Sequence, residues 1–229
     1  MTYQDAIAFL FPLHRFGMKM SLENITALCN YLGNPERRLG TVVHIAGTNG
    51  KGSTAAFMAS ICQEAGLKTA LYTSPHVERF EERIRINGQM ISEDYIAGLT
   101  ADLKAKIQDL NATFFEATTA MAFRYFSEES VDVSVIEVGM GGRLDATNVV
   151  LPDYCLITPI DYDHQQWLGE TIEQIAAEKA GIVKSRAQTI VARQHLEALE
   201  VIMAVAKEKK SRLLQLPQRL HTVNLRPLR

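Results

Sequence analysis

The sequence has few cysteines, and they are not grouped. Cys29, Cys62 and Cys155 occur singly within apolar segments. Their spacing matches neither a zinc-binding motif nor the disulfide framework of a small secreted domain. We therefore interpret all three as packing residues and expect a cytoplasmic protein.

The chain also lacks a strong net charge and a long uninterrupted apolar run. Its 229 residues include 24 Lys and Arg and 26 Asp and Glu, for a formal net charge of −2. That balance provides no basic field for nucleic acid or for an anionic membrane. Charges interrupt every apolar run well before the roughly 18 residues that a membrane span needs. The first residues carry Asp5 and no basic cluster, so we also expect no signal peptide.

An alternation of strand-like and helix-like segments dominates the chain. Residues 1–40 predict helices and end in the turn-rich LGNPERRLG, whereas residues 211–229 have no clear period and predict an irregular tail. Strands are expected at 41–47, 68–74, 131–139, 153–160 and 187–193. Helices are expected at 53–66, after Ser92, and at 114–129, 171–184 and 195–210, with a loop-rich stretch at 75–92. This alternation favours one α/β domain with a doubly wound, mostly parallel sheet, whose ligands bind at the carboxyl ends of strands.

A glycine-rich segment, GTNGKGST, joins the first of these strands to the helix that follows it. Glycines let backbone N–H groups turn toward phosphate oxygens, and a helix N-terminus adds positive charge. Lys51 then suits the β- and γ-phosphates, and Ser53 or Thr54 offers a hydroxyl to Mg²⁺. The pattern is a variant of GxxxxGK[ST], because Ile45 stands at its first glycine position and Gly52 follows the lysine. The alternative is a plain glycine-rich turn with a surface lysine. The residues expected to contact a nucleotide are Thr48, Asn49, Gly50, Lys51, Gly52, Ser53 and Thr54.

Further polar residues follow other predicted strands. Ser74 and His76 end the second strand, Glu137 lies in the apolar run VIEVG, and His164 follows the fourth strand. A buried, unpaired carboxylate is costly, and Mg²⁺ takes oxygen ligands. Taken singly, Ser74 could be a turn residue, Glu137 could pair with an arginine, and His164 could cap a loop. Together at neighbouring strand ends, they favour a metal–nucleotide site.

Lys179 occupies an apolar position in the predicted helix 171–184. Ile172, Ile175 and Ala176 mark the same helix face before it. A lysine in such a position usually extends its amine to the surface or pairs with an acid.

Five segments, GTNGKGS, TSPH, EVGMGGRLDATN, DHQQWLG and EKAGI, resemble the folylpolyglutamate synthase and dihydrofolate synthase family of the Mur ligase superfamily. They occur in that family's order and spacing over about residues 1–195. The resemblance implies a P-loop ATP-binding domain of Mur ligase type. It also implies ATP-dependent joining of L-glutamate to a folate or to dihydropteroate through an acyl phosphate. ATP and Mg²⁺, with two ions, are the implied cofactors, small molecules are the implied partners, and a monomer is expected.

The resemblance also assigns roles to individual residues. Lys51 and the loop amides correspond to phosphate-binding groups, while Ser53, Ser74 and Glu137 correspond to ligands of the first Mg²⁺. His164 corresponds to a ligand of the second Mg²⁺.

Two further roles rest on the same resemblance. Lys179 stands where the family carries a carbamylated lysine, a change that turns a buried cation into an anion able to help bind metal. Lys51, Lys179 and His164 are therefore the expected catalytic residues. His76 and Arg83, within SPHVERFEERIRING, correspond to the folate side of the site.

The resemblance is incomplete toward the C-terminus. Family members are longer and add further strands with an HQ-type motif, followed by a smaller glutamate-binding domain. These features are not recognised here, so we expect a truncated chain, and the alternative function is an inactive ATP-binding fragment. A ligase of peptidoglycan precursors is a third possibility, disfavoured because Thr54 follows GKGS and because TSPH stands on the substrate side.

Overall fold

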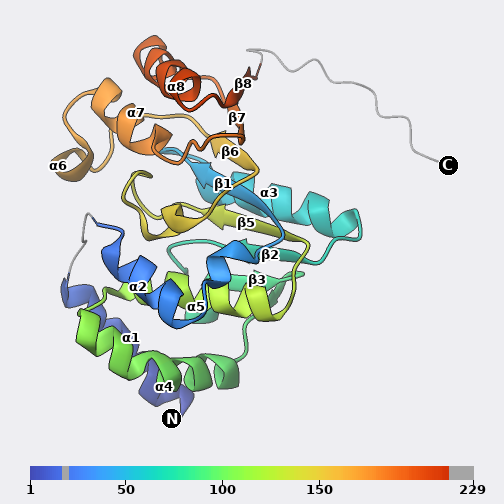
Figure 1. Ribbon diagram of the computed structural model, residues 1–229, viewed down its shortest axis with the longest axis vertical. Helices are drawn as coiled ribbons and strands as arrows, with labels where there is room; N and C mark the ends of the chain where they lie inside the picture. The colour runs from blue at the N-terminus through green and yellow to red at the C-terminus, as the bar shows by residue number, and fades with distance from the viewer. Residues whose placement is uncertain (17–20, 217–229) are drawn as a thin grey trace.

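An eight-stranded sheet forms the centre of the computed structural model, which describes residues 1–16 and 21–216 (Figure 1). The strand order is β4-β3-β2-β5-β1-β6-β7-β8. The pairs from β2 to β8 are parallel, and β3 and β4 form an antiparallel edge. The strands are β1 (Thr41–Ala46), β2 (Thr69–Tyr72), β3 (Ile84–Ile86), β4 (Gln89–Met90), β5 (Val133–Glu137), β6 (Tyr154–Ile157), β7 (Gln188–Val191) and β8 (Arg212–Gln215). The predicted doubly wound, mostly parallel sheet is confirmed.

Helices cover the sheet on both faces (Figure 1). The α-helices are α1 (Tyr3–Leu10), α2 (Glu23–Tyr31), α3 (Lys51–Glu64), α4 (Glu93–Leu110), α5 (Phe114–Glu128), α6 (Gln165–Leu168), α7 (Ile172–Ala180) and α8 (Leu196–Glu208). The 3₁₀ helices are η1 (Phe11–Phe16), η2 (Pro35–Arg37), η3 (Phe80–Arg83) and η4 (Ala146–Val149). No helix among residues 1–16 and 21–216 is both long and apolar enough to span a membrane.

The hydrophobic core divides along the two faces of the sheet. Because side chains alternate along a strand, Val43 and Ile45 of β1 pack with Ala55 and Ala59 of α3 on one face. The other face of β2 and β5 packs against α5 and the amino-terminal helices, which α4 covers in turn. A separate cluster joins α7 and α8 to β6 and β7. The central strand β5 is buried along its whole length, as expected for a strand covered on both faces.

Two expectations about local structure were wrong. The stretch 75–92 was expected to be a loop, yet it contains η3 and the hairpin β3–β4. Asn87 and Gly88 form its turn with positive φ values of 49° and 76°, as the Asn-Gly pair favours.

The tail expected to be irregular contains β8, because residues 212–215 pair in parallel with β7. A four-residue strand that gains order from its neighbour leaves little periodic signal in the sequence. The rest of that expected tail, from 217 onward, and residues 17–20 of the helical segment lie outside the described residues.

The topology brings the predicted site residues to one edge of the sheet. Strands β2, β5, β1 and β6 are consecutive in the sheet, and their carboxyl ends carry the TSPH, VIEVG, GTNGKGST and DHQQWLG segments. Parallel strands place their carboxyl ends on the same side, so residues that are distant in the sequence meet there.

Candidate functional site

The glycine-rich loop turns from β1 into α3 as expected. Gly47 has a φ of 146°, and a Cβ on it would lie 1.9 Å from Thr158 Oγ1. Gly50, with a φ of 81°, is the N-cap residue of α3 and offers no side-chain cap. The amides of Lys51, Gly52 and Ser53 begin the helix and therefore have no acceptor within it. The chemistry of this first turn suits an anion, since its free N–H donors and the positive end of the helix dipole point the same way.

The earlier part of the loop is held by the protein itself. The amides of Thr48 and Asn49 donate to the carbonyl of Pro159 at 3.0 and 3.3 Å. The Thr48 hydroxyl donates to the Asp161 carbonyl at 3.0 Å and accepts from the Asp161 amide at 3.1 Å. Thr48 and Asn49 were also predicted to contact the nucleotide, but their amides fasten the loop to the end of β6. The amides without an acceptor in the helix are those of Lys51, Gly52 and Ser53 in the first turn of α3.

Lys51 bends back over its own loop. Its Nζ donates to the carbonyl of Thr48 at 3.1 Å, and the residue is half-buried. Its charge is close enough to lower the pKa of Glu137. The loop lysine therefore interacts electrostatically with the carboxylate at the end of β5.

Glu137 is 4% exposed at the end of β5, opposite Ile45 in the sheet register. Its Oε2 accepts a hydrogen bond from the Ser74 amide at 3.0 Å. Burial raises the pKa of Glu137, and the Ser74 amide and the charge of Lys51 oppose that rise. A Cβ added to Gly52 would lie 3.3 Å from Oε1. The glycine that sets this loop apart from the common pattern therefore lies close to the buried carboxylate.

Lys179 is 2% exposed and points at the same loop. Its Nζ donates to the carbonyl of Gly47 at 2.8 Å. Burial and the nearby charge of Lys51 lower the pKa of Lys179 to about 8, against the opposing charges of Asp163 and Asp145. The side chain does not reach the surface, and it forms no ion pair with the part of the chain that the structure describes, in contrast to both ordinary interpretations of a lysine on an apolar helix face.

The GMGGRLDATN and EKAGI segments pack against each other next to Lys179. The Arg143 amide donates to the Glu178 carbonyl at 2.8 Å, and the two side chains form an ion pair at the same distance. A Cβ on Gly142 would lie 2.8 Å from the carbonyls of Glu178 and Lys179, and one on Gly181 would lie 2.3 Å from the Arg143 Cβ. Glycine at both positions lets the GMGGRLDATN loop seat against the end of α7.

His164, the predicted ligand of a second ion, is exposed, whereas Glu137 is buried. It occupies the N-cap position of α6 with a φ of 48°, and its side chain is half-exposed. Its Nε2 lies 3.5 Å from Asp163 Oδ2. Within the described ranges, no three His, Cys, Asp or Glu side chains gather as a ready-made metal site.

A cavity of about 480 Å³ opens beside the loop at the strand ends; we call it the strand-end cavity. Ser74, Arg83 and His164 line it, so it unites the predicted residues of three segments. Aromatic rings form much of its remaining wall, namely Phe114, Phe115 and Trp167.

The predicted folate-side residues His76 and Arg83 contact each other, and Arg83 lines this cavity. Arg83 Nε donates to His76 Nδ1 at 2.7 Å, and its Cζ lies 5.1 Å from the centroid of the Phe114 ring. His14 stacks on the same ring at 4.0 Å. Burial lowers the pKa of Arg83, although a guanidinium remains charged at neutral pH.

Glu116 is a cavity residue that the sequence reasoning missed. It is 4% exposed, and its Oε2 accepts from the Thr113 amide at 2.7 Å and from Asn24 Nδ2 at 3.2 Å. Its Oε1 is buried without a hydrogen-bond partner among the described residues. Thr113 and Glu116 have the spacing of a helix capping box, which is sufficient reason for a glutamate at this position. The sequence therefore offered no indication that Glu116 also lines the cavity.

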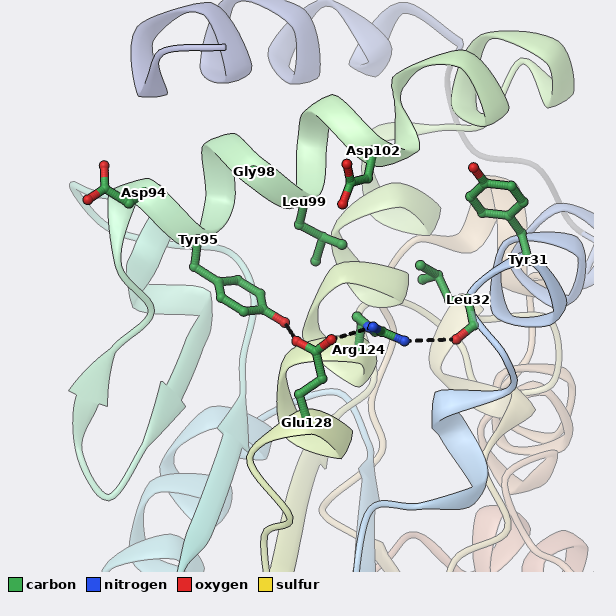
Figure 2. Close-up of a pocket in the computed structure, with 9 residues that line it drawn as sticks. All are labelled: Tyr31, Leu32, Asp94, Tyr95, Gly98, Leu99, Asp102, Arg124 and Glu128. Atoms are coloured by element: carbon green, nitrogen blue, oxygen red, sulfur yellow. Dashed lines mark hydrogen bonds and ion pairs between the residues drawn. The ribbon is translucent and has the colours of Figure 1, made fainter.

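A second hollow, of about 620 Å³, lies between α2, α4 and α5 (Figure 2). None of the predicted site residues lines it. Glu128 forms an ion pair with Arg124 and accepts from the Tyr95 hydroxyl, and Arg124 donates to the Leu32 carbonyl at 3.2 Å. Glu128, Arg124 and Tyr95 thus have hydrogen-bond partners within the protein.

Known proteins resemble this chain over most of its length. The family model described as Mur ligase middle domain matches residues 45–222. The dihydrofolate synthase/folylpolyglutamate synthase of Bacillus subtilis is 44% identical over 208 residues, which cover 88% of this chain and 48% of the relative. An FPGS–AMPPCP–folate complex matches with a TM-score of 0.90 and 36% identity, covering 96% of this chain and 57% of that one.

A structure of Escherichia coli FolC in complex with DHPP and ADP matches with a TM-score of 0.84 and 37% identity, covering 94% of this chain and 51% of that one. The chain thus spans about half the length of the curated relatives it matches.

Proposed function

Because the chain belongs to the Mur ligase family through its middle domain, we propose that it is the ATP-binding part of a ligase that joins L-glutamate to a folate. One observation carries the proposal. A glycine-rich loop, a buried carboxylate and a buried lysine converge beside an aromatic-walled cavity, at Gly47–Gly52, Glu137 and Lys179. The substrates of the named relatives suit that arrangement.

ATP would bind at the start of α3. The amides of Lys51, Gly52 and Ser53 are the donors directed at its phosphates, and Lys51 neutralises their charge. Thr48 and Asn49 support this cradle by keeping the loop fastened to β6. Phosphoryl transfer depends mainly on such positioning and charge neutralisation.

Mg²⁺ fits the residues around Glu137. Its carboxylate is buried, accepts a hydrogen bond from the Ser74 amide, and lies next to the glycine-rich loop at Gly52. We infer that Glu137, Ser53 and Ser74 hold one ion and that His164, from the cavity rim, helps hold a second. Bound there, Mg²⁺ supplies charge neutralisation for the phosphate oxygens during transfer.

The folate or dihydropteroate would bind in the strand-end cavity. Its flat rings suit the walls formed by Phe114 and Phe115, since aromatic rings favour stacked or edge-to-face contacts. Glu116 Oε1, which has no partner among the residues that the structure describes, would accept a hydrogen bond from an N–H donor such as the amino group of a pterin. Arg83, with His76 behind it, would attract the acceptor carboxylate.

The proposed reaction has two steps. An oxygen of the acceptor carboxylate attacks the γ-phosphorus of ATP, the bond to the β-phosphate oxygen breaks, and ADP leaves. The amine of glutamate then attacks the acyl carbon, loses a proton and expels phosphate, which leaves the amide. In this chain, Lys51 and the first turn of α3 would hold the phosphates while the cavity holds the carboxylate in line.

Calorimetry of MgATP binding to the purified chain tests the nucleotide site. We expect Lys51→Ala to weaken binding roughly 10- to 100-fold, the size expected for a lost charge-assisted contact. Lys106→Ala removes the same charge from exposed α4 and is the matched control. Equal affinities for wild type and Lys51→Ala would reject the assignment of the loop.

Ligation by this chain alone is a separate question, because the chain spans about half the length of its relatives. An inactive nucleotide-binding fragment is the second candidate. Incorporation of labelled glutamate into dihydropteroate or tetrahydrofolate decides between the two. Clear MgATP binding without incorporation would favour the fragment.

A further inference from the structure

His44 is a polar residue in the middle of an apolar strand. It is fully buried in β1, on the face of the sheet away from α3, and its neighbours in the register are Ile136 and Cys155. Its Nε2 lies 2.8 Å from Thr147 Oγ1. Its Nδ1 is buried with no hydrogen-bond partner within residues 1–16 and 21–216. A valine at this position would avoid the cost of burying a nitrogen without a hydrogen bond. The contact between His44 Nε2 and Thr147 is therefore the feature to explain.

The hydrogen bonds around Thr147 determine which atom donates. Burial raises the pKa of Asp145, and hydrogen bonds from the amides of Met140 and Thr147, both at 2.9 Å, oppose that rise. Donors on both carboxyl oxygens favour the ionised form, which can only accept. The Thr147 hydroxyl also contacts Asp145 Oδ1 and must donate to it, because a carboxylate has no proton to give. The hydroxyl has one proton, so its contact with His44 is one in which Nε2–H donates. His44 is therefore the Nε2–H tautomer.

These contacts connect β1, which leads into the glycine-rich loop, to the wall of the strand-end cavity. His44 lies in β1 shortly before the glycine-rich loop, whereas Asp145 and Met140 line the strand-end cavity. Asp145 Oδ2 holds the Met140 amide, and Oδ1 is oriented by Thr147. The position of this wall thus depends on a donor that β1 supplies.

We propose that His44 is a positioning residue that orients Asp145 and the Met140 wall of the strand-end cavity through the Thr147 hydroxyl. The proposal rests on the proposed function only for the identity of the ligand in the cavity. The hydrogen-bond relay itself concerns this chain alone. His44 does not touch that ligand and acts through Thr147 and Asp145.

Three variants separate orientation from simple packing. His44→Leu keeps an apolar volume and removes the donor, whereas His44→Gln keeps a side-chain N–H at about the reach of Nε2. Thr147→Val removes the hydroxyl that passes the contact on. We expect His44→Leu and Thr147→Val each to speed hydrogen exchange of the Met140 amide about tenfold, and the double variant to add little. His44→Gln restores slow exchange.

Binding gives a second readout with a built-in contrast. We expect His44→Leu and Thr147→Val to weaken dihydropteroate binding about tenfold in calorimetry while MgATP affinity stays within twofold of wild type. A purely structural role would lower both affinities together, and His44→Gln would not recover them. That pattern would overturn the proposal.

Nitrogen-detected NMR of wild-type His44 provides a test that needs no ligand. The proposal expects a protonated Nε2 and an unprotonated Nδ1, and the reverse tautomer or a charged ring would overturn it. If wild type binds no dihydropteroate, the proposed function fails. The relay is then judged by the tautomer and by Met140 exchange, with unchanged exchange in His44→Leu counting against it.

Discussion

Two buried ionisable side chains lie against one loop, and their pKa values shift in opposite directions. Burial raises the pKa of Glu137 and lowers the pKa of Lys179 to about 8. Both shifts favour the neutral form of the side chain. The charged form of each group would be stabilised by a bound partner of opposite charge. Clustered shifts of this kind favour a functional site, since an ordinary core avoids the cost.

Carbamylation of Lys179 is expected to depend on pH. Its neutral amine attacks the carbon of CO₂, forms an N–C bond and releases a proton, which leaves an anion. With its pKa lowered to about 8, the neutral fraction rises as pH passes through 8, whereas an ordinary lysine needs a pH near 10.5. Carbon NMR with labelled bicarbonate should show a carbamate at pH 8.5 that weakens by pH 7.

The control for this prediction is a pair of lysine variants. Lys179→Met should abolish the carbamate signal, and Lys106→Met, which changes a partly exposed lysine of α4 outside the candidate site, should leave it intact. A signal that survives in Lys179→Met would move the modification to another residue.

Glu137→Gln separates metal binding from folding. The glutamine side-chain oxygen can still accept the hydrogen bond from the Ser74 amide. The substitution also removes a carboxylate whose burial disfavours the charged form, as the raised pKa of Glu137 indicates. We therefore expect an unfolding temperature without Mg²⁺ equal to or above that of wild type, together with loss of most of the stabilisation that MgATP provides. Thermal melts with and without MgATP measure both. Full MgATP stabilisation in the variant would contradict a metal role for Glu137.

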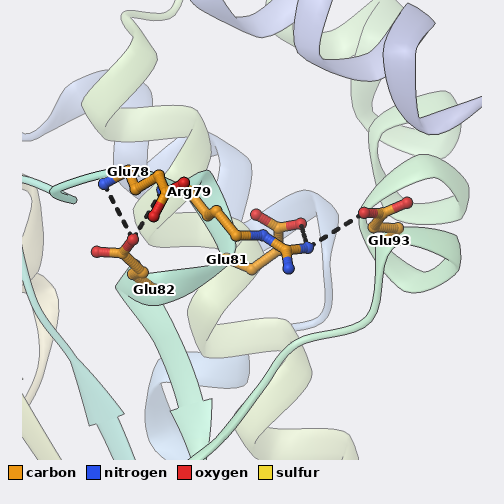
Figure 3. Close-up of polar contacts among 5 residues, drawn as sticks. All are labelled: Glu78, Arg79, Glu81, Glu82 and Glu93. Carbon is orange, nitrogen blue, oxygen red and sulfur yellow. Dashed lines mark hydrogen bonds and ion pairs between the residues drawn. The ribbon is translucent and has the colours of Figure 1, made fainter.

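Among the structural elements, the turn after β2 is held by one carboxylate (Figure 3). Glu82 accepts from the amides of Val77, Glu78 and Arg79 at 2.8, 3.0 and 2.7 Å. Arg79 in turn bridges Glu81 and Glu93 at 2.8 and 3.2 Å (Figure 3). The turn carries His76, so its order contributes to the position of His76 against Arg83 at the strand-end cavity.

The order of this turn should depend on Glu82 and on acid. The three amides lower the pKa of Glu82 from 4.5 to about 2. A carboxyl whose pKa is lower in the folded state than in the unfolded state stabilises the fold at pH values above the unfolded pKa. This contribution is lost as pH falls from about 4.5 through about 2. Glu82→Gln should speed hydrogen exchange of the Val77, Glu78 and Arg79 amides severalfold at neutral pH.

Glu93→Gln is the matched control for the turn, because it weakens a contact of Arg79 and leaves the Glu82 hydrogen bonds in place. Its three turn amides should exchange as in wild type. Equal acceleration in both variants would show that the ion pairs, rather than Glu82, order the turn.

For the molecule as a whole, the two edges of the sheet differ. One edge is the two-residue strand β4, which is too short to pair extensively. The other is β8, whose Leu214 is 47% exposed and which has no further neighbour within the described strands. An exposed apolar edge is a surface for unwanted strand pairing.

A charge on β8 should therefore reduce self-association. We expect Leu214→Lys to lower the light scattering of concentrated samples by severalfold with little change in unfolding temperature, because the side chain is already half-exposed. Leu196→Lys, at an exposed position of α8, controls for added charge away from the edge. Equal improvement by both variants would assign the effect to net charge.

The sequence by itself determined the fold class, most of the strands and helices, and the loop, because these depend on apolar periodicity and on glycines within a few residues. It also predicted that the polar strand ends would meet, since parallel strands share one carboxyl edge. It missed β8 and the Asn87–Gly88 hairpin, although the hairpin had a local signal.

Only the tertiary structure decided where the buried polar atoms find partners. The sequence placed Lys179 on an apolar helix face, but its amine reaches the carbonyl of Gly47, 132 residues away. The contact of His44 with Thr147 likewise arises only once distant segments pack, and so does the burial of Glu116 Oε1, which has no partner within the described residues. The physical reason is that a buried polar group must be satisfied in three dimensions, and its partner need not be a sequence neighbour.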